Sequence, residues 1–491
     1  MRQEITTILS DVGGLYKIIS FFVLVPLGVA FYTHDWISSG AFLLILFYFA
    51  GVGHLLDRLP QYREYTKLSS ALASIALAWL TSGIVFGIPY YFNADMSFSQ
   101  AAFEGMAGWT STSFSFLSIT EQIDLTSSLF FWRAYSQWIG GFFMLCVFIA
   151  LMKGGQHSSF YQSVHERRHE HIITSLQIAI RKVLPYYLIF SLIAWCAILA
   201  QNVSLLDSIY LMLSSVSTGG FVPHPGSIMF YDNVNLEMAL ICIMIASALP
   251  LPLYFTLLFQ RDISVFVRER QVLLLLSLIL FTTVIVAYNL LSGMIEEGSS
   301  LDFWTAVRYG LFMSVASVTT TGFWNTTLGG WGDGTLILIM LLIFIGGSTL
   351  SMAGGIKLRR VLLWFAGLTW WIRQIFAPSH AMVPLFFEGE RIGTREANLE
   401  ISKSTIVIVS SVLLIGVAIL LSVHMQPDID VLPVIFDSIS AFGTCGISLG
   451  YFKADMPVIS IWVGIFLMWA GKLEIIPVIM LIITLFRRTD A

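Results

Sequence analysis

Four short stretches of small polar residues recur along the chain, and each could supply oxygen ligands to a cation. They read Thr110-Ser111-Thr112-Ser113, Ser217-Thr218-Gly219-Gly220, Thr319-Thr320-Thr321-Gly322 and Gly443-Thr444-Cys445-Gly446. Loops of this composition can turn backbone carbonyls toward one point, and rings of carbonyls replace the hydration shell of a monovalent cation. Threonine and serine hydroxyls add further oxygen atoms. We call these stretches the first to fourth filter loops and number their residues as positions one to four.

The spacing of the filter loops indicates an internal repeat. The fourth positions are 113, 220, 322 and 446, at intervals of 107, 102 and 124 residues, and the longest interval contains an insert at 361–401. Four units of one period place four equivalent loops around one axis normal to a membrane. Glycine at three of the fourth positions allows a positive φ and a close approach to that axis. The short helix before each loop would point its negative C-terminal end at the cation.

A second candidate site combines a glycine-rich stretch with a lysine inside an apolar segment. The stretch 346–355 is predicted to be a non-helical gate, through Gly346, Gly347, Ser348, Thr349, Ser351, Gly354 and Gly355. Each glycine destabilises a helix by about 1 kcal/mol relative to alanine, although close helix packing through small residues is the alternative. Lys472 lies within the apolar segment 457–486, where a charge costs at least about 2.5 kcal/mol. It either faces the pore or pairs with an acid such as Glu474.

The elements that must hold these residues are membrane helices. Of 491 residues, 57% are hydrophobic and 11% charged, against about 25% charged in soluble domains. With a net charge of −4 and no basic patch, the chain is neither a nucleic-acid binder nor disordered. Ten apolar segments approach the length of a span: 16–33, 41–56, 68–92, 128–152, 183–201, 235–259, 271–293, 335–357, 404–423 and 457–486.

Four weaker segments, at 97–109, 205–216, 302–318 and 429–442, are too short to span and each leads into a filter loop. We expect them to enter the membrane from outside and to return as loops buried in protein. With both termini cytoplasmic, the inner segments hold 22 of the 26 lysines and arginines. The outer half then has 16 acidic residues and three basic ones, either to attract cations or simply to solvate the outer loops.

At these residues the sequence resembles the membrane subunit of the Trk/Ktr/plant high-affinity potassium transporter superfamily. The resemblance runs from about 67 to 487 and includes the filter loops, RAYSQWIGG at 133–141, FIGGSTLSMAGGIK at 344–357 and GKLE at 471–474. It implies a potassium pore, a homodimer and a cytoplasmic nucleotide-binding regulatory subunit in the cell (inner) membrane. In the family, the stretch matching 346–355 blocks the pore, and an arginine usually stands where this chain has Lys472. The helix pair at 16–56 resembles the Trk type.

We therefore expect an all-α polytopic membrane protein with four repeats around a pseudo-fourfold pore. The predicted divisions are an N-terminal helix pair at 1–66, pore repeats at 67–160, 161–265 and 266–376, and a linker with the fourth repeat at 377–491. The expected function is uptake of potassium, with sodium as the alternative ion, and no bound cofactor. A secondary transporter of another solute built from repeats is the alternative. No ATP-binding loop or catalytic cluster predicts an enzyme.

The chain departs from the family at Ser113, where potassium-selective members have glycine. A Cβ there keeps the first loop from reaching the axis in the same way, and family members of the plant branch with serine are associated with sodium. Our hypothesis is weaker discrimination of potassium from sodium. Four charged residues, Arg133, Arg308, Glu104 and Asp437, are expected to brace the filter from behind. A histidine-rich loop at 157–171 is interpreted as a solvated surface rather than a metal site.

Overall fold

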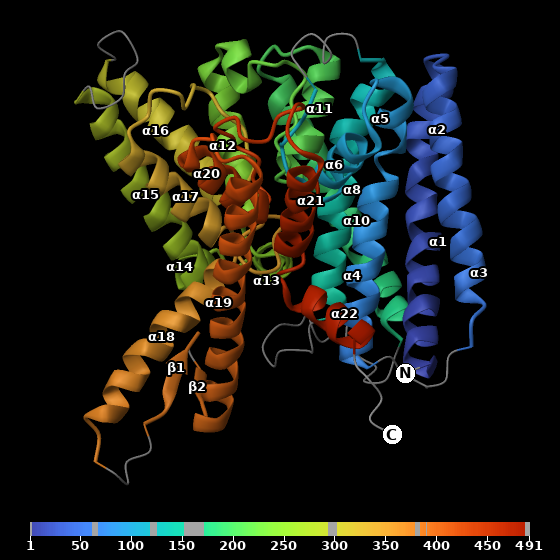
Figure 1. Cartoon of the computed structure of the whole chain (residues 1–491). Coiled ribbons are helices and arrows are strands. Elements are labelled where there is room, and N and C mark those ends of the chain that lie inside the picture. The colour runs from blue at the N-terminus through green and yellow to red at the C-terminus, as the bar shows by residue number, and fades with distance from the viewer. Residues whose placement is uncertain are drawn as a thin grey trace.

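Apolar helices side by side make up most of the structure, a computed structural model that describes residues 2–60, 67–117, 125–151, 171–292, 302–378, 383–388 and 390–486 (Figure 1). Seven described helices are long and apolar enough to cross a membrane. Ten of the described helices are α1 (Arg2–Tyr32), α4 (Leu68–Val85), α8 (Ser127–Leu151), α10 (Ile172–Leu199), α12 (Val234–Ala248), α15 (Arg270–Leu291), α17 (Asp333–Ile345), α18 (Leu358–Ile375), α19 (Thr394–Met425) and α21 (Val458–Lys472).

Ten further helices complete the described part of the chain. They are α2 (Trp36–Phe47), α3 (Gly53–Asp57), α5 (Ile88–Asn93), α6 (Phe98–Trp109), α11 (Leu205–Val216), α13 (Leu251–Gln260), α14 (Val265–Arg268), α16 (Phe303–Val318), α20 (Val431–Phe442) and α22 (Ile476–Phe486), with a π turn η1 (Tyr48–Val52) and a 3₁₀ turn η2 (Ser227–Tyr231). The helical membrane fold predicted from the sequence is confirmed, with one short β-hairpin added among the described residues.

The four helices that lead into the filter loops are α6, α11, α16 and α20, within two residues of the predicted segments. Each begins at a polar side chain that caps its first turn: Ser97, Ser204, Asp302 and Asp430. Each packs against both the helix before it and the helix after it in the chain. A cap at one end and a loop of small residues at the other therefore limit these helices to 12–16 residues.

Three predicted spans are corrected by the structure. The segment 235–259 is broken between α12 and α13 with a bend of 99°, and 457–486 is broken between α21 and α22 with a bend of 111°. Glu474 and Ile475 have φ of 60° and 56°, which a helix cannot contain. At the N-terminus, α1 begins at Arg2 rather than near residue 16, because Val12 and Leu15 are buried and extend its packed face.

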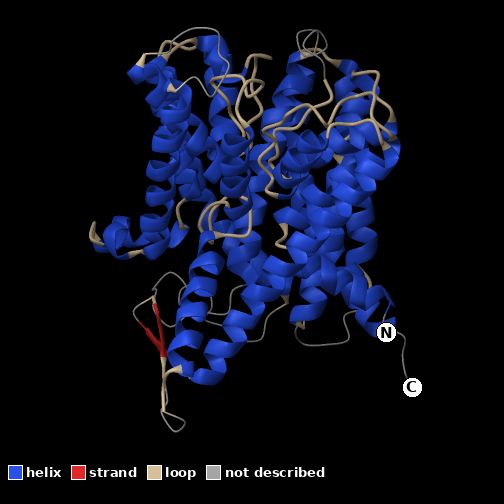
Figure 2. Cartoon of the chain, turned by 60° about the vertical axis from the view of Figure 1, so that its left-hand side comes forward, coloured by secondary structure: helices blue, strands red, loops and turns tan. Residues whose placement is uncertain are grey.

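The insert at 361–401 forms a small unit of its own. It contains all but the first three residues of α18 and a hairpin of β1 (Leu385–Phe387) and β2 (Glu390–Ile392), beside the start of α19. Figures 1 and 2 show this unit projecting from the bundle on the side where both chain ends lie. A separate apolar core, which includes Trp370 and Phe387, holds it together. Burial raises the pKa of the Glu388 carboxyl, although its ion pair with Arg359 acts in the opposite direction.

Candidate ion filter and gate

All four filter loops begin with the same helix ending. In each, the N–H of position two donates to the carbonyl three residues back, and the N–H of position three donates to the carbonyl five residues back. In the first loop these are Ser111 N to Gly108 O at 3.1 Å and Thr112 N to Ala107 O at 2.8 Å. This pair of bonds is the Schellman motif, which satisfies the last carbonyls of a helix. The sequence repeat is therefore also a repeat of backbone geometry.

The second positions lie in the left-handed region of backbone conformation. Their φ angles are 49° at Ser111, 52° at Thr218, 53° at Thr320 and 51° at Thr444. Glycine is the usual residue at this point of a Schellman motif, and a β-branched residue there is strained by about 1–3 kcal/mol. Three threonines and a serine hold this conformation in four places, so the surrounding structure must enforce it. Strain of this kind clusters at functional sites.

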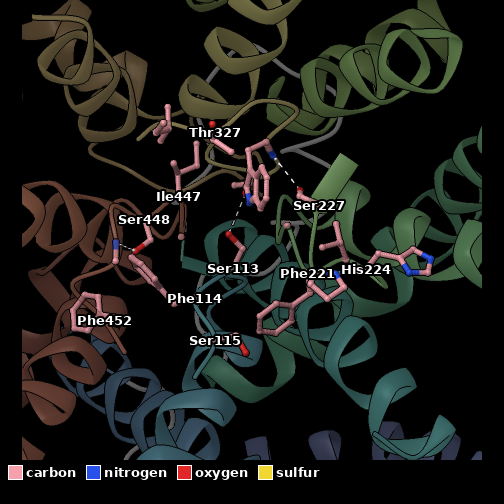
Figure 3. Close-up of a pocket in the computed structure, with 18 of the residues that line it drawn as sticks. Ser113, Phe114, Ser115, Phe221, His224, Ser227, Thr327, Ile447, Ser448 and Phe452 are labelled. Atoms are coloured by element: carbon pink, nitrogen blue, oxygen red, sulfur yellow. Dashed lines mark hydrogen bonds between the residues drawn. The ribbon is translucent and has the colours of Figure 1, made fainter. Parts of the chain in front are cut away.

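The fourth positions of the loops line one cavity of about 420 Å³ (Figure 3). Gly220, Gly322 and Gly446 have φ of 81°, 80° and 90°. A Cβ added to Gly220 would lie 2.0 Å from Thr321 O, and one added to Gly322 would lie 2.1 Å from Cys445 O. Glycine is therefore required at these positions for two reasons: the positive φ, and a neighbouring loop that occupies the space a side chain would need.

Ser113, the fourth position of the first loop, has no positive φ. Its hydroxyl donates to Cys445 O at 2.9 Å and to Gly322 O at 3.3 Å, and its N–H donates to Cys445 O at 3.2 Å. Figure 3 shows this side chain pointing into the space between the loops. The expectation that serine would not follow the glycine geometry agrees with this backbone. The hydroxyl also occupies carbonyls of two other loops.

Two buried carboxylates hold the segments that follow the first and fourth loops. Each lies nine residues before its fourth position, and each is fully buried. Glu104 accepts from Ser115 Oγ at 2.7 Å and from Phe116 N, while Asp437 accepts from Ser448 Oγ at 2.6 Å and from three backbone N–H groups. These contacts agree with a bracing role.

The two arginines expected behind the filter also make specific contacts. Arg133 Nη2 donates to Ser115 Oγ at 3.2 Å, and its guanidinium lies 4.6 Å from the centre of the Phe221 ring. Arg308 forms two hydrogen bonds of 2.8 Å with Glu237, a bidentate pair of the strong kind. Arg133 therefore ties α8 to the residues that follow the first and second loops, whereas Arg308 ties α16 to α12.

The segment 346–357 between α17 and α18, here the gate loop, is not helical. Gly346 and Gly355 have φ of 71° and 77°. Gly354 N donates to the hydroxyl of Thr320 in the third filter loop at 2.6 Å, and a Cβ on Gly354 would lie 2.2 Å from Thr444 Oγ1. The other contacts of the loop include Gly347 N with Gly354 O, Ser348 N with Ala248 O, Thr349 N with Gln271 Oε1 and Ser351 Oγ with Ser348 O.

Lys472 links the first filter loop to the gate loop. Its Nζ donates to Ser111 Oγ and to Met352 O, the latter at 3.1 Å, and only 3% of the residue is exposed. The alternative that it pairs with Glu474 is wrong, because Glu474 forms an ion pair with Arg360. The lysine therefore reaches the second position of a filter loop.

Sequence reasoning missed Gln137 and the left-handed second positions. Gln137 is fully buried on α8 and contacts two filter loops at once. The available signal was a single amide side chain in an apolar helix, within the motif at 133–141. His157, His165 and His169 lie outside the described residues, and the described part of the chain contains no cluster of metal-binding side chains.

Known proteins similar to this chain are cation transporters. The TrkH family of cation transport proteins matches residues 87–488. An uncharacterized cation transporter of Methanocaldococcus jannaschii is 28% identical over 99% of this chain and 97% of its own length. The Trk system potassium uptake protein TrkH of Salmonella typhimurium is 22% identical over 97% of this chain and 98% of that protein. The crystal structure of the potassium transporter TrkH from Vibrio parahaemolyticus superposes with a TM-score of 0.83 at 21% identity, covering 99% and 100% of the two chains.

Fold and site together define a helical, multi-pass membrane protein of cation transport. The chain belongs to the TrkH family, and it is a membrane subunit of the Trk type.

Proposed function

We propose that this chain carries potassium across the membrane through the four filter loops, and that the gate loop closes the path beneath them. The observation that carries the proposal is the convergence of four identical helix endings on one cavity. Four C-terminal helix ends bring partial negative charge to one place, which favours a cation. The names of the curated relatives support potassium as the ion.

The second-position hydroxyls supply a further argument for a cation path. Thr218 Oγ1 and Thr444 Oγ1 are buried without a hydrogen-bond partner among the described residues. A buried hydroxyl without a partner is destabilising by about 1–3 kcal/mol. A partly dehydrated cation at this level would give both oxygens a partner, as rings of protein oxygens do in potassium filters.

The gate proposal rests on the contacts between the gate loop and the filter loops. Gly354 N donates directly to the Thr320 hydroxyl, and Met352 O accepts from Lys472 Nζ, which also donates to Ser111 Oγ. A fixed positive charge and a backbone segment under the loops oppose the passage of a cation. We propose that opening moves the gate loop away from Thr320 and separates it from Lys472.

Two further parts of the proposal rest on the family alone: the chain forms a homodimer, and a cytoplasmic nucleotide-binding subunit controls the gate. The placement of both termini in the cytoplasm rests on the distribution of lysines and arginines. The projecting unit of α18 and the hairpin follows directly after the gate loop, and Arg360 of α18 bonds Glu474 at the break between α21 and α22. A partner that moves α18 would therefore act on both structures that flank the gate.

The deciding experiment is ion flux in liposomes that contain the purified chain, measured for K⁺, Rb⁺, Na⁺ and Li⁺ at a fixed membrane potential. We expect K⁺ and Rb⁺ flux above Na⁺ and Li⁺ flux, and a large increase when 346–355 is deleted. Flux of no cation from either protein would refute the proposal. The deletion separates a closed gate from a wrong pore assignment.

A further inference from the structure

The side chain of Gln137 joins the first filter loop to the second. Its Nε2 donates to Thr112 O at 3.2 Å and to Gly219 O at 2.8 Å, the third-position carbonyls of the two loops. Its Oε1 accepts from Ser214 Oγ and from Phe221 N, both at 3.1 Å. An amide side chain has two donor hydrogens and two acceptor lone pairs. All four are used, and every partner belongs to a filter loop, its helix or the residue directly after it.

The helix that carries Gln137 is fixed against both loops. A Cβ on Gly140 would lie 2.1 Å from Trp109 O, the last residue of α6, and one on Gly141 would lie 3.0 Å from the Ser217 side chain. The backbone of α8 therefore rests directly on the ends of two pore-lining elements. A side chain on this helix has little freedom to follow the loops if they move.

One planar group that bonds two carbonyls also limits how far apart their oxygens can move. Thr112 and Gly219 precede the residues that line the cavity, so the position of their carbonyls affects the ring of oxygens around a cation. Selectivity between potassium and sodium depends on the size of such a ring and on how freely its carbonyls move. We propose that Gln137 is a positioning residue for selectivity, because it holds the first and second loops at the spacing that suits the larger ion.

This inference rests on the proposed function, since it assumes that cations pass the filter loops. It differs from a general structural role in what it changes. Loss of packing would lower the amount of folded protein or the flux of every ion alike. Loss of positioning would change the ratio of potassium to sodium flux at similar total flux.

Two substitutions separate the donor side of the amide from the acceptor side. Gln137→Glu keeps the shape and the acceptor for Ser214 and Phe221, but an ionised carboxylate donates to neither carbonyl. Gln137→Met keeps the volume and removes all four hydrogen bonds. We expect both to lower the K⁺/Na⁺ flux ratio, by about tenfold for Met, which corresponds to about 1.4 kcal/mol.

The chain offers a matched control in Gln271, a second buried glutamine, whose Oε1 accepts from Thr349 N of the gate loop. Gln271→Met should change total flux and leave the K⁺/Na⁺ ratio unchanged. Ser136→Ala, next to Gln137 on α8, removes a hydroxyl that donates to Arg133 O of the same helix and should change neither quantity.

The measurement is K⁺ and Na⁺ flux in liposomes of phosphatidylethanolamine and phosphatidylglycerol. The segment 346–355 is deleted in the Gln137 and Ser136 variants and their parent, and it is retained in the Gln271 variant and its parent, because Thr349 belongs to it. If the Met variant does not fold, thermal stabilisation of the Gln137→Glu protein by K⁺ compared with Na⁺ gives the same comparison without transport. A selective parent protein with an unchanged ratio in both variants overturns this inference alone. A parent protein without cation flux overturns the proposed function, and the inference with it.

Discussion

The first filter loop and the other three reach the same cavity by different means. Gly220, Gly322 and Gly446 use a positive φ, and two of them lie directly against a neighbouring carbonyl. Ser113 lacks that angle and instead bonds the neighbouring loops through its hydroxyl. The comparison teaches that the same position in a pseudo-symmetric repeat can be occupied either by close backbone approach or by a side chain. The side chain of Ser113 also hydrogen-bonds two neighbouring carbonyls, which a glycine at this position would not do.

The strongest test of this difference places a serine in a glycine loop. We expect Gly446→Ser to reduce K⁺ flux about 100-fold or more, because serine at a φ of 90° is strained by about 1–3 kcal/mol and its Cβ would lie 2.3 Å from Ser113 N. Flux in liposomes, after a check that the protein elutes as a single species, measures this. Near-normal flux would show that the fourth loop does not need glycine.

A second test concerns Lys472, which joins the first filter loop to the gate loop. Lys472→Met should raise basal K⁺ flux about tenfold, because a positive charge and two hydrogen bonds between Ser111 and the gate loop are lost. Lys472→Arg should stay close to the native flux. If the two variants behave alike, the charge at this position has no part in closure.

The reverse substitution in the first loop should have a smaller effect. Ser113→Gly removes one hydroxyl and frees Cys445 O and Gly322 O from its two hydrogen bonds, each with a net value of about 1 kcal/mol. We expect the K⁺/Na⁺ flux ratio to rise several-fold and total flux to remain similar. An unchanged ratio would remove Ser113 from the account of selectivity.

The smallest effects are expected at the second positions. Thr320→Val removes the acceptor of Gly354 N and should raise basal flux by a few-fold, because a buried N–H is left without a partner.

Thr218→Val removes a hydroxyl that bonds no described residue, so the gate should stay closed and K⁺ flux through the gate-deleted protein should fall. Parallel flux assays with and without 346–355 distinguish the two.

Much of this architecture could be predicted from the sequence, since hydropathy and the repeat near 110 residues are strong signals. The four short helices followed from length, caps and the small residues after them, and the non-helical gate loop followed from its glycines. The breaks at Pro250 and at Glu474 were missed although both carry a local signal. Pro250 and Pro252 cannot continue the hydrogen bonds of a helix, and Gly471, Lys472 and Glu474 interrupt the last apolar run.

The side-chain contacts of the site were less accessible to sequence reasoning. Gln137 forms hydrogen bonds to residues as far as 84 positions away, and no local pattern reports such contacts. The left-handed threonines were also missed, because Thr218, Thr320 and Thr444 occupy a position where glycine is the usual residue. Tertiary structure imposes that conformation against the local preference.

The contact between gate and filter has a thermodynamic consequence. The hydroxyls of Thr320 and Ser111 accept hydrogen bonds from the gate loop and from Lys472, whereas those of Thr218 and Thr444 bond no described residue. A cation that takes all four hydroxyls as ligands must compete with the gate loop and Lys472 for two of them. Binding and opening are then linked, and the linkage is reciprocal: the open gate strengthens ion binding by the same factor by which the ion favours opening. In this arrangement the transported ion would act as an effector of its own passage.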